Sequence, residues 1–457
     1  MMSSRDEMIK TITERTKLID RYIDDHPECD TKMVQHAFQS GKIEAIKVYE
    51  LPRSLVRLNP NNGRFKAELD IITQERKQEN NPTELNPDHP DDVKTLQDMI
   101  KGEYPRSSER RRAYENLRGN IHEVAQKTGT NGQEIPGLIT HDGILINGNR
   151  RWVVMEDLAS TDQEKYPREP LKYDKIHVGR LKKDVDKYTL WKNEAKEQIS
   201  RDSREEYDYV NSALEIKRGF ELLTDQGMSK ERAKVEIAKT VYGRDKKDIT
   251  AYLDFLDITD LFLEYIDKEG QYTLVQEAGD DKGIVTILQD ISKERMKNVR
   301  SGMEIEETDQ WLKTAFAFCL FSKEKPTVKQ DGTVKKLSFG HREYRQFQKK
   351  VLDPPNIRKE FFKNPGVQKI DLASTSVEDA AVFYQAVRDA QTKYDINEDI
   401  NTPVSLLKRA VITLSKISQD LNGSRKEAMV KQIKDGGGMQ YLSDITTYLK
   451  DINKKIQ

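Results

Sequence analysis

The stretch DGILINGNRR at residues 142–151 carries the clearest structural signal in this chain. Its apolar run 144–146 is typical of a short buried strand, and Gly148 followed by Asn149 and two arginines indicates that a helix begins there. Glycine lets a backbone approach a ligand closely, a helix N-terminus presents free N–H groups, and arginine adds a planar fork that suits phosphate. The junction therefore predicts a site for a nucleotide triphosphate or a nucleic-acid backbone. A β-turn with surface arginines is the alternative.

The segments around this junction predict a small mixed α/β core. Residues 46–65 combine β-branched residues with proline and asparagine, which indicates a strand followed by a loop. The segment 114–128 has helical spacing, two short strands are expected around the turn at 141–143, and 175–181 fits a further strand. The polar, proline-punctuated segment 66–113 is expected to be an insertion with one or two helices.

Both flanks of this core are expected to be helical. Isoleucines near helical spacing predict a helix over 5–45, with the Gly-Lys pair at 41–42 as its stop signal. From about residue 190 the chain is expected to be helical to its end. Loops are expected near 267–284, 324–338 and 434–439. The expected fold class is therefore α+β, a small mixed α/β core followed by a large all-α region.

Composition limits the class of protein further. The 457 residues include 77 basic and 78 acidic side chains, so the formal net charge is 77 − 78 = −1 and any basic surface must be local. Cys29 and Cys319 are too few for a disulfide scaffold, and the seven histidines lack metal-binding spacing, so neither zinc nor haem is expected. The longest apolar stretch, 315–321, is far below the roughly 20 residues that span a bilayer. Because the N-terminus lacks a signal-peptide pattern, a cytoplasmic protein without membrane contact is expected.

Three short motifs occur in the order in which one known family has them. NPNNGR at 59–64 follows the first expected core strand, GQEIP at 132–136 leads into the next, and GNRR at 148–151 opens a helix. Together they resemble the N-terminal domain of ParB-type partition proteins, which has the ParB/sulfiredoxin fold. The resemblance covers 46–65 and 114–275, under half of the chain.

The resemblance implies a nucleotide site. In the family the arginine box grips a nucleotide triphosphate, CTP in the partition proteins, so CTP or another nucleotide triphosphate with Mg²⁺ is the implied ligand. The implied phosphate contacts are Gly148, Asn149, Arg150, Arg151, Asn62, Gly63, Arg64 and Arg201. Glu194 is implied as the magnesium carboxylate, although the spacing over 193–201 departs from the family pattern, and a solvated helix face is the alternative. Asn149 stands where sulfiredoxin has its cysteine, so thiol chemistry is not implied.

With this resemblance the chain divides into four expected segments. An N-terminal helical segment (1–45) precedes the ParB/sulfiredoxin-like core (46–185), which contains the insertion at about 66–113. A helical domain with a helix-turn-helix (186–275) and a C-terminal helical region (276–457) follow.

The helical domain carries a pattern typical of DNA binding. Short helices are expected over 230–240 and 245–256, with Gly243 in the turn and the small Ala238 where the helices cross. The spacing from that alanine to the glycine is one residue longer than the family has. The candidate DNA contacts are Arg244, Lys246, Lys247 and Thr250. Aspartates on the second helix would repel phosphate, so a three-helix packing unit without DNA is the alternative.

An apolar stripe closes the chain after a glycine hinge at 436–438. Its members, at three- and four-residue spacing, are Leu442, Ile445, Leu449, Ile452 and Ile456. Since partition-type proteins act as dimers, the stripe predicts a weak homodimer through 441–457. Packing on the body of the same chain is the alternative.

The leading functional hypothesis is a ParB-like DNA-binding protein with a nucleotide site. One alternative is a nuclease or nucleotide triphosphatase on the same fold, in a plasmid, phage or phage-defence system. A nuclease normally needs clustered carboxylates, and no such cluster can be assembled from the sequence, so no catalytic residue is assigned. A non-catalytic adaptor is the other alternative.

Overall fold

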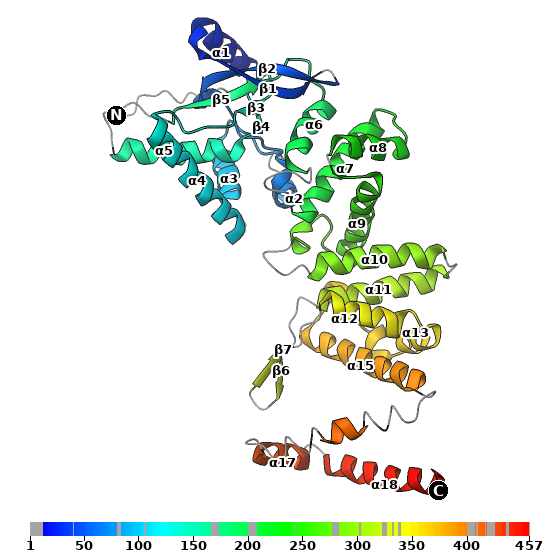
Figure 1. Cartoon of the computed structure of the whole chain (residues 1–457). Coiled ribbons are helices and arrows are strands. Elements are labelled where there is room, and N and C mark those ends of the chain that lie inside the picture. Colours follow the sequence, from blue (N-terminus) through cyan, green and yellow to red (C-terminus); the bar gives the residue numbers. More distant parts are fainter. Residues whose placement is uncertain are drawn as a thin grey trace. The chain divides into compact units, whose positions relative to one another are not determined.

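The computed structural model contains two compact units (Figure 1). The first comprises Met1–Tyr344 with Ile370–Val377, and the second Arg345–Lys369 with Glu378–Gln457. The residues described are 12–39, 41–79, 84–104, 107–165, 173–199, 208–241, 243–276, 283–300, 303–321, 327–330, 333–336, 340–399, 407, 410–415, 417, 426–435 and 438–456.

A mixed sheet forms the centre of the first unit, which confirms the predicted α/β core. Within the described residues it has five strands in the order β1-β2-β5-β3-β4. They are β1 (Asp30–Gln39), β2 (Lys42–Pro52), β3 (Gly137–Ile139), β4 (Leu145–Asn147) and β5 (Lys175–Arg180). The β3–β5 pair is parallel and the other pairs are antiparallel.

Helices cover both faces of this sheet. The larger apolar cluster joins strands β2 to β5 to α1 (Ile12–Asp25), α3 (Pro90–Lys101), α4 (Ser108–Thr128) and α5 (Asn149–Lys165). A smaller cluster, with Ile46, Leu138 and Ile146 at its centre, packs against Leu190 of α6 (Lys187–Gln198). The strand–helix order predicted for residues 135–181 is therefore confirmed.

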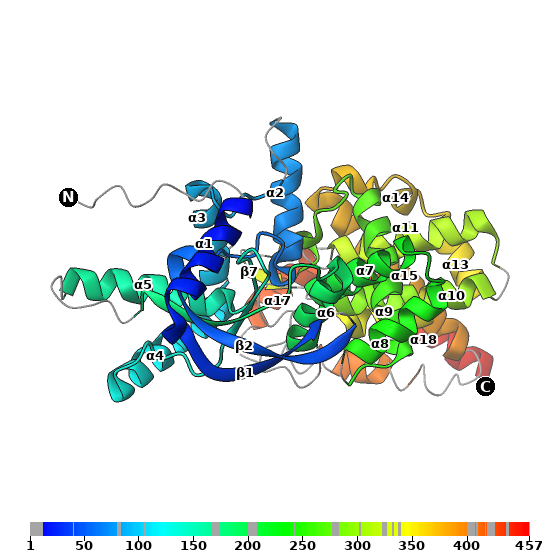
Figure 2. The same cartoon turned by 90° about the horizontal axis from the view of Figure 1, so that it is seen from above.

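The helix predicted over 5–45 is wrong beyond Asp25. Residues 30–52 form the β1–β2 hairpin, which Figure 2 shows as two long strands running together toward α6. Gly41, predicted as a helix stop, lies near the hairpin end with φ +80°, a left-handed conformation that glycine adopts easily. Ile46 and Val48 point to one buried side, a period of two that favours a strand over a helix.

The segment 66–113, predicted to hold one or two helices, holds two complete helices and the start of a third, and an ion network joins it to the core. It contains α2 (Lys66–Gln78), α3 and the start of α4. Arg15 of α1, 1% exposed, donates to Asp88 at 2.8 Å and to Asp142 at 2.9 Å, and Arg57 binds Asp88 at 2.7 Å. The turn that precedes α3 is thereby fixed to the turn between β3 and β4.

The rest of the first unit is mainly helical, as predicted. It contains α7 (Tyr209–Asp225), α8 (Lys230–Thr240), α9 (Lys246–Tyr265), α10 (Gly283–Arg300), α11 (Ile305–Phe321) and the start of α12 (His341–Phe347). The loop expected near 324–338 includes a hairpin, β6 (Thr327–Gln330) and β7 (Thr333–Lys336). None of the helices in the described part of the chain combines the length and the apolar character that a membrane crossing requires.

The regular elements described in the second unit are all helical. Its elements are a π-helical turn (Gln348–Leu352), α13 (Pro355–Phe362), α14 (Pro365–Gln368), most of α15 (Val377–Asp399), α17 (Lys426–Asp435) and α18 (Gly438–Ile456). Phe347, Phe361 and Phe383 form an aromatic cluster with ring centroids 5.7 to 6.1 Å apart.

The contact between α6 and α7 leaves no room for a side chain at position 219. Gly219 lies against the indole ring of Trp191, and a Cβ atom added to Gly219 would stand 2.3 Å from Cζ2 of that ring. Trp191 is 1% exposed, and its Nε1–H donates to the carbonyl oxygen of Glu215 at 2.9 Å. The ring is thus held in place, and the glycine sets the distance between the two helices.

We expect Gly219→Ala to destabilise the protein by about 1–3 kcal/mol, because overpacking outweighs the gain of about 1 kcal/mol in helix propensity. Gly119→Ala in α4 is the matched control, since a Cβ atom there meets nothing within 4 Å. The control should leave stability unchanged or raise it by up to about 1 kcal/mol. Urea unfolding followed by circular dichroism measures both. Equal effects of the two substitutions would contradict the packing argument.

Candidate functional site

The three sequence motifs meet in the folded chain, because Asn149 contacts the loop Asn59–Arg64 and Arg151 contacts Ile135. The loop Asn59–Arg64 follows β2, and the backbone N–H of Asn59 donates to Oδ1 of Asn149 at 2.8 Å. Inside the loop, Asn61 N–H donates to Asn59 Oδ1 at 2.9 Å, and Arg64 N–H donates to Asn62 Oδ1 at 3.1 Å. The loop is therefore a preformed turn that rests on the first residue of α5.

The strand–glycine–helix junction is present as predicted. Gly148 has φ +102°, and a Cβ atom there would stand 3.2 Å from Cα of Gly137. Its carbonyl oxygen accepts from the N–H of Trp152 at 3.0 Å, so α5 begins directly after it. In this structure the glycine permits a close approach of two backbones, and the positive end of α5 lies beside the Asn59–Arg64 loop.

The arginines of the predicted site are half-buried. The guanidinium of Arg151 donates to the carbonyl oxygen of Ile135 and lies 3.5 Å from Oδ1 of Asn147, so it closes the end of the β3–β4 pair. Arg64 and Arg150 are also half-buried and lie on the loop and the first turn of α5. Arg201 lies outside the described residues.

Glu194 is buried, so the alternative of a solvated helix face is wrong. It is 3% exposed on α6. Its Oε1 accepts from the backbone N–H of Gly63 at 2.9 Å, and its Oε2 accepts from Nη2 of Arg218 at 3.0 Å. Among the described side chains there is no group of three or more His, Cys, Asp or Glu residues placed to hold a metal ion. Its role as a magnesium ligand stays a prediction, and such a role would require the ion to compete with Arg218.

Three residues of α7 that the sequence analysis missed complete this region. Asn211 donates to the carbonyl oxygen of Arg64 and accepts from the N–H of Ala67, both at 2.9 Å. Glu215 is fully buried against Gly63, where an added Cβ atom would stand 2.5 Å from its Oε2. The signal available in the sequence was the spacing of Asn211, Glu215 and Arg218, which places three polar residues on one face of an apolar helix.

Two buried carboxylates share one guanidinium in this region. Nη2 of Arg218 lies 2.6 Å from Oε1 of Glu215 as well as 3.0 Å from Glu194, so one guanidinium faces two carboxylates. In the described part of the chain, the Glu215 oxygens have no hydrogen-bond partner apart from this ion pair with Arg218. Burial raises the pKa of Glu215 to about 7, with Arg218 lowering it and Glu194 raising it.

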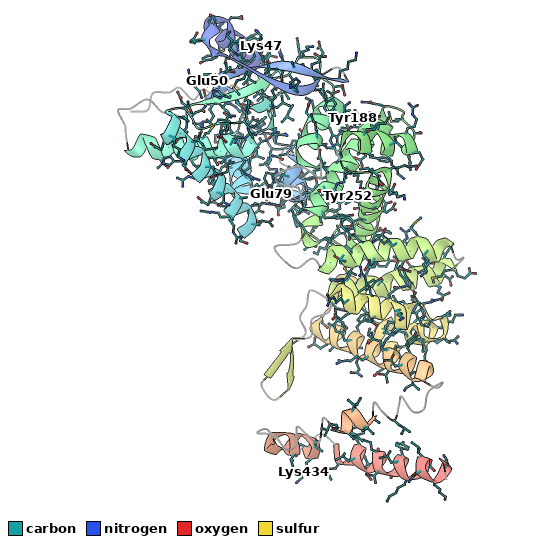
Figure 3. All side chains as sticks on the ribbon, viewed as in Figure 1. Lys47, Glu50, Glu79, Tyr188, Tyr252 and Lys434 are labelled. Atoms are coloured by element: carbon teal, nitrogen blue, oxygen red, sulfur yellow. The ribbon has the colours of Figure 1, made fainter. Side chains whose placement is uncertain are left out.

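The helix-turn-helix residues lie elsewhere in the first unit, on α8 and α9. Lys246 pairs with Glu231 of α8 at 2.5 Å, and the Thr250 hydroxyl donates to the carbonyl oxygen of Lys246 at 2.9 Å. The Arg244 guanidinium lies 5.5 Å from the ring centroid of Tyr252, which Figure 3 labels on α9. Lys247 is exposed.

Acidic residues cap the start of α9. Asp245 accepts from the N–H groups of Lys247 and Asp248 at 2.7 and 2.9 Å, and Asp248 accepts from the N–H of Asp245 at 3.1 Å. This capping box satisfies the helix N-terminus internally. Ala238, predicted at the helix crossing, is only half-buried, whereas Ala233 of α8 is fully buried.

Comparison with known proteins assigns neither a family nor a function to this chain. No family model matches the chain, and searches of curated proteins and of solved structures found no match.

Glu215 predicts a specific pH dependence of stability. Because its pKa in the folded state is about 7 against an ordinary 4.5, the folded chain binds more protons between these values, and stability falls as pH rises through this window. Between pH 4.5 and 7.5 the wild-type protein should lose stability on the order of 3 kcal/mol through this group. Glu215→Gln should abolish that loss. Urea unfolding across that range measures it, with exposed Glu109→Gln as the control. Parallel pH profiles of wild type and Glu215→Gln would contradict the assignment.

Proposed function

We propose that this chain is a cytoplasmic DNA-binding protein of the ParB type whose α/β core binds CTP or another nucleotide triphosphate with Mg²⁺. The observation that carries the proposal is the hydrogen bond from Asn59 to Asn149, which joins the Asn59–Arg64 loop to the start of α5. A preformed loop, a helix N-terminus and arginines from both elements are then neighbours, a combination suited to phosphate.

The surrounding residues support this role by holding the loop. Glu194 binds the loop at Gly63, and Asn211 binds it at Arg64 and at Ala67. These partners come from α6 and α7, so contacts within the protein hold the loop. A preorganised loop loses less conformational entropy when a phosphate binds.

Calorimetry with CTP, ATP and GTP in the presence of Mg²⁺ tests this proposal. Arg150→Ala should weaken nucleotide binding by about 1.5–3 kcal/mol, the contribution of a charge-assisted hydrogen bond, or roughly 10- to 150-fold. The exposed Arg112→Ala has the same change of charge and should bind as wild type does. No heat with any of the three nucleotides, with and without DNA, would sink the proposal.

DNA contact is proposed through α8 and α9, at Arg244, Lys246, Lys247 and Thr250. The exposure of Lys246 and Lys247 in the first turn of α9 supports it, and Arg244 lies two residues before that helix begins. The Lys246–Glu231 pair must open for Lys246 to meet a phosphate. An exposed pair of this kind is worth only about 0–1 kcal/mol, so this cost is small.

The alternatives differ from this proposal in one measurable step each. A nucleotide triphosphatase would release phosphate from a mixture of protein, nucleotide and Mg²⁺, which a phosphate assay measures. A nuclease would cleave the added DNA, which a gel shows. An adaptor binds neither nucleotide nor DNA.

The proposed homodimer uses the stripe on α18. Most of its apolar side chains are exposed, among them Leu442 at 39%, Leu449 at 47% and Ile452 at 40%, with Tyr441 and Tyr448 beside them at 68% and 67%. Burying several such side chains, at roughly 1.5–3 kcal/mol each, can narrowly offset an association cost of about 4–15 kcal/mol. The exposure therefore favours a second chain as the partner of this face.

Leu442→Asp combined with Leu449→Asp should convert a weak dimer into a monomer, because each carboxylate would be buried in the pairing face. Gln440→Asp with Thr447→Asp adds the same charge at exposed positions outside the stripe and should leave the dimer intact. Light scattering over a range of concentrations measures the mass. A wild-type chain that stays monomeric at every concentration contradicts the proposal.

A further inference from the structure

At one edge of the sheet, the side chain of Asn193 on α6 makes the backbone hydrogen bonds that a neighbouring strand would make. β1 is the outermost strand, and near its end the N–H of Phe38 donates to Oδ1 of Asn193 at 2.7 Å. The Nδ2–H of Asn193 donates back to the carbonyl oxygen of Phe38 at 3.0 Å, and Asn193 is 3% exposed. This reciprocal pair of hydrogen bonds fixes Phe38 against α6.

Two lysines of α6 share the ring that is fixed in this way. Nζ of Lys192 lies 4.9 Å from the ring centroid of Phe38 and 5.2 Å from that of Tyr188, which Figure 3 labels near the start of α6. Nζ of Lys196 lies 5.7 Å from the Phe38 centroid. Lys192 is only 8% exposed, so its stem is enclosed and its ammonium is held over aromatic faces.

This arrangement differs from that of other helical lysines in the chain. Many lysines on the described helices pair with an acid three or four residues away. Such pairs are Lys66–Asp70, Lys94–Asp98, Lys127–Glu123, Lys234–Glu231, Lys239–Glu236, Lys297–Glu294 and Lys455–Asp451. The positions three and four residues from Lys192 and Lys196 hold no acid, and each is four residues from the other.

Within the described side chains, the two lysines are therefore a pair of like charges without a salt bridge. Like charges at this spacing destabilise a helix by about 0.2–0.5 kcal/mol. Among the side chains that the structure describes, no carboxylate makes a salt bridge to Lys192 or Lys196. An anion placed between the two ammonium groups would remove the repulsion and would find both cations already oriented.

We propose that Lys192 and Lys196, held over Phe38, form an anion site that takes a phosphate group. Phosphate suits the site because it offers several oxygens to two ammonium groups, each with three donors. The phosphate can come from a nucleotide or from a nucleic-acid backbone. The site shares no residue with the Asn59–Arg64 loop or with α5, so it stands whether or not nucleotide binds there.

The test compares two double variants of the full chain with equal loss of charge. Lys192→Gln with Lys196→Gln removes the site, and Lys183→Gln with Lys187→Gln removes two exposed lysines nearby in sequence. The probes are sodium tripolyphosphate and CTP by calorimetry, and a 20-base-pair duplex titrated at several salt concentrations. Lys246→Ala with Lys247→Ala reports DNA contact through α9 separately.

If a nucleic-acid backbone is the source, the slope of log Kobs against log salt falls by about two units in the first variant and not in the second, at about 0.9 per phosphate contact. If a nucleotide is the source, binding of CTP and tripolyphosphate weakens at least tenfold while the DNA slope is unchanged. Lys196→Gln alone keeps the packing of Lys192 and should show about half of either effect. The proposal is overturned if both double variants match each other with every probe, or if wild type binds none of the probes. Loss of CTP binding in Arg150→Ala would concern the proposed nucleotide site at α5. The lysine site is judged by its own double variant.

Discussion

The geometry of the first unit depends on the hydrogen bond from the backbone of Gly63 to the buried carboxylate of Glu194. This bond attaches the loop after β2 to α6, and Asn149 and Asn211 hold the same loop from α5 and α7. Three successive helices, each far from this loop in sequence, are thereby positioned on one short turn. Residue 63 must be small, because a Cβ atom there would collide with Glu215.

The charge of this joint is as important as its shape. Two buried carboxylates face one guanidinium, and buried ions of this kind gain little net stability because their desolvation cancels much of their attraction. Apolar packing of Trp191 on Gly219 supplies the adhesion between α6 and α7. The ionic groups select one arrangement of that packing, because displacing Arg218 would break the ion pairs of both buried acids with it.

Consecutive residues of α6 thus make contacts on two different sides of the helix. Glu194 faces the loop and α7, whereas Asn193 faces the edge of the sheet at Phe38. Lys192 and Lys196 lie on the side of Asn193, one helical turn apart. Both of the phosphate sites proposed above therefore depend on how this one helix lies across the sheet.

The sequence by itself determined the local elements whose patterns are short and complete, such as the β4–α5 junction at Gly148 and the helix Lys230–Thr240. It misled over 30–45, because the helix indicated by isoleucines before residue 25 was extended to the Gly-Lys pair at 41–42, whereas these residues pair as a hairpin. Only the tertiary structure decided that Asn149 accepts a hydrogen bond from Asn59 and that Glu194 is buried against Gly63. It also decided that Glu215 and Arg218 form ion pairs in this region. These partners lie 90 and 131 residues apart in the first two cases, and spacing along a chain records which residues share a face but not which faces meet.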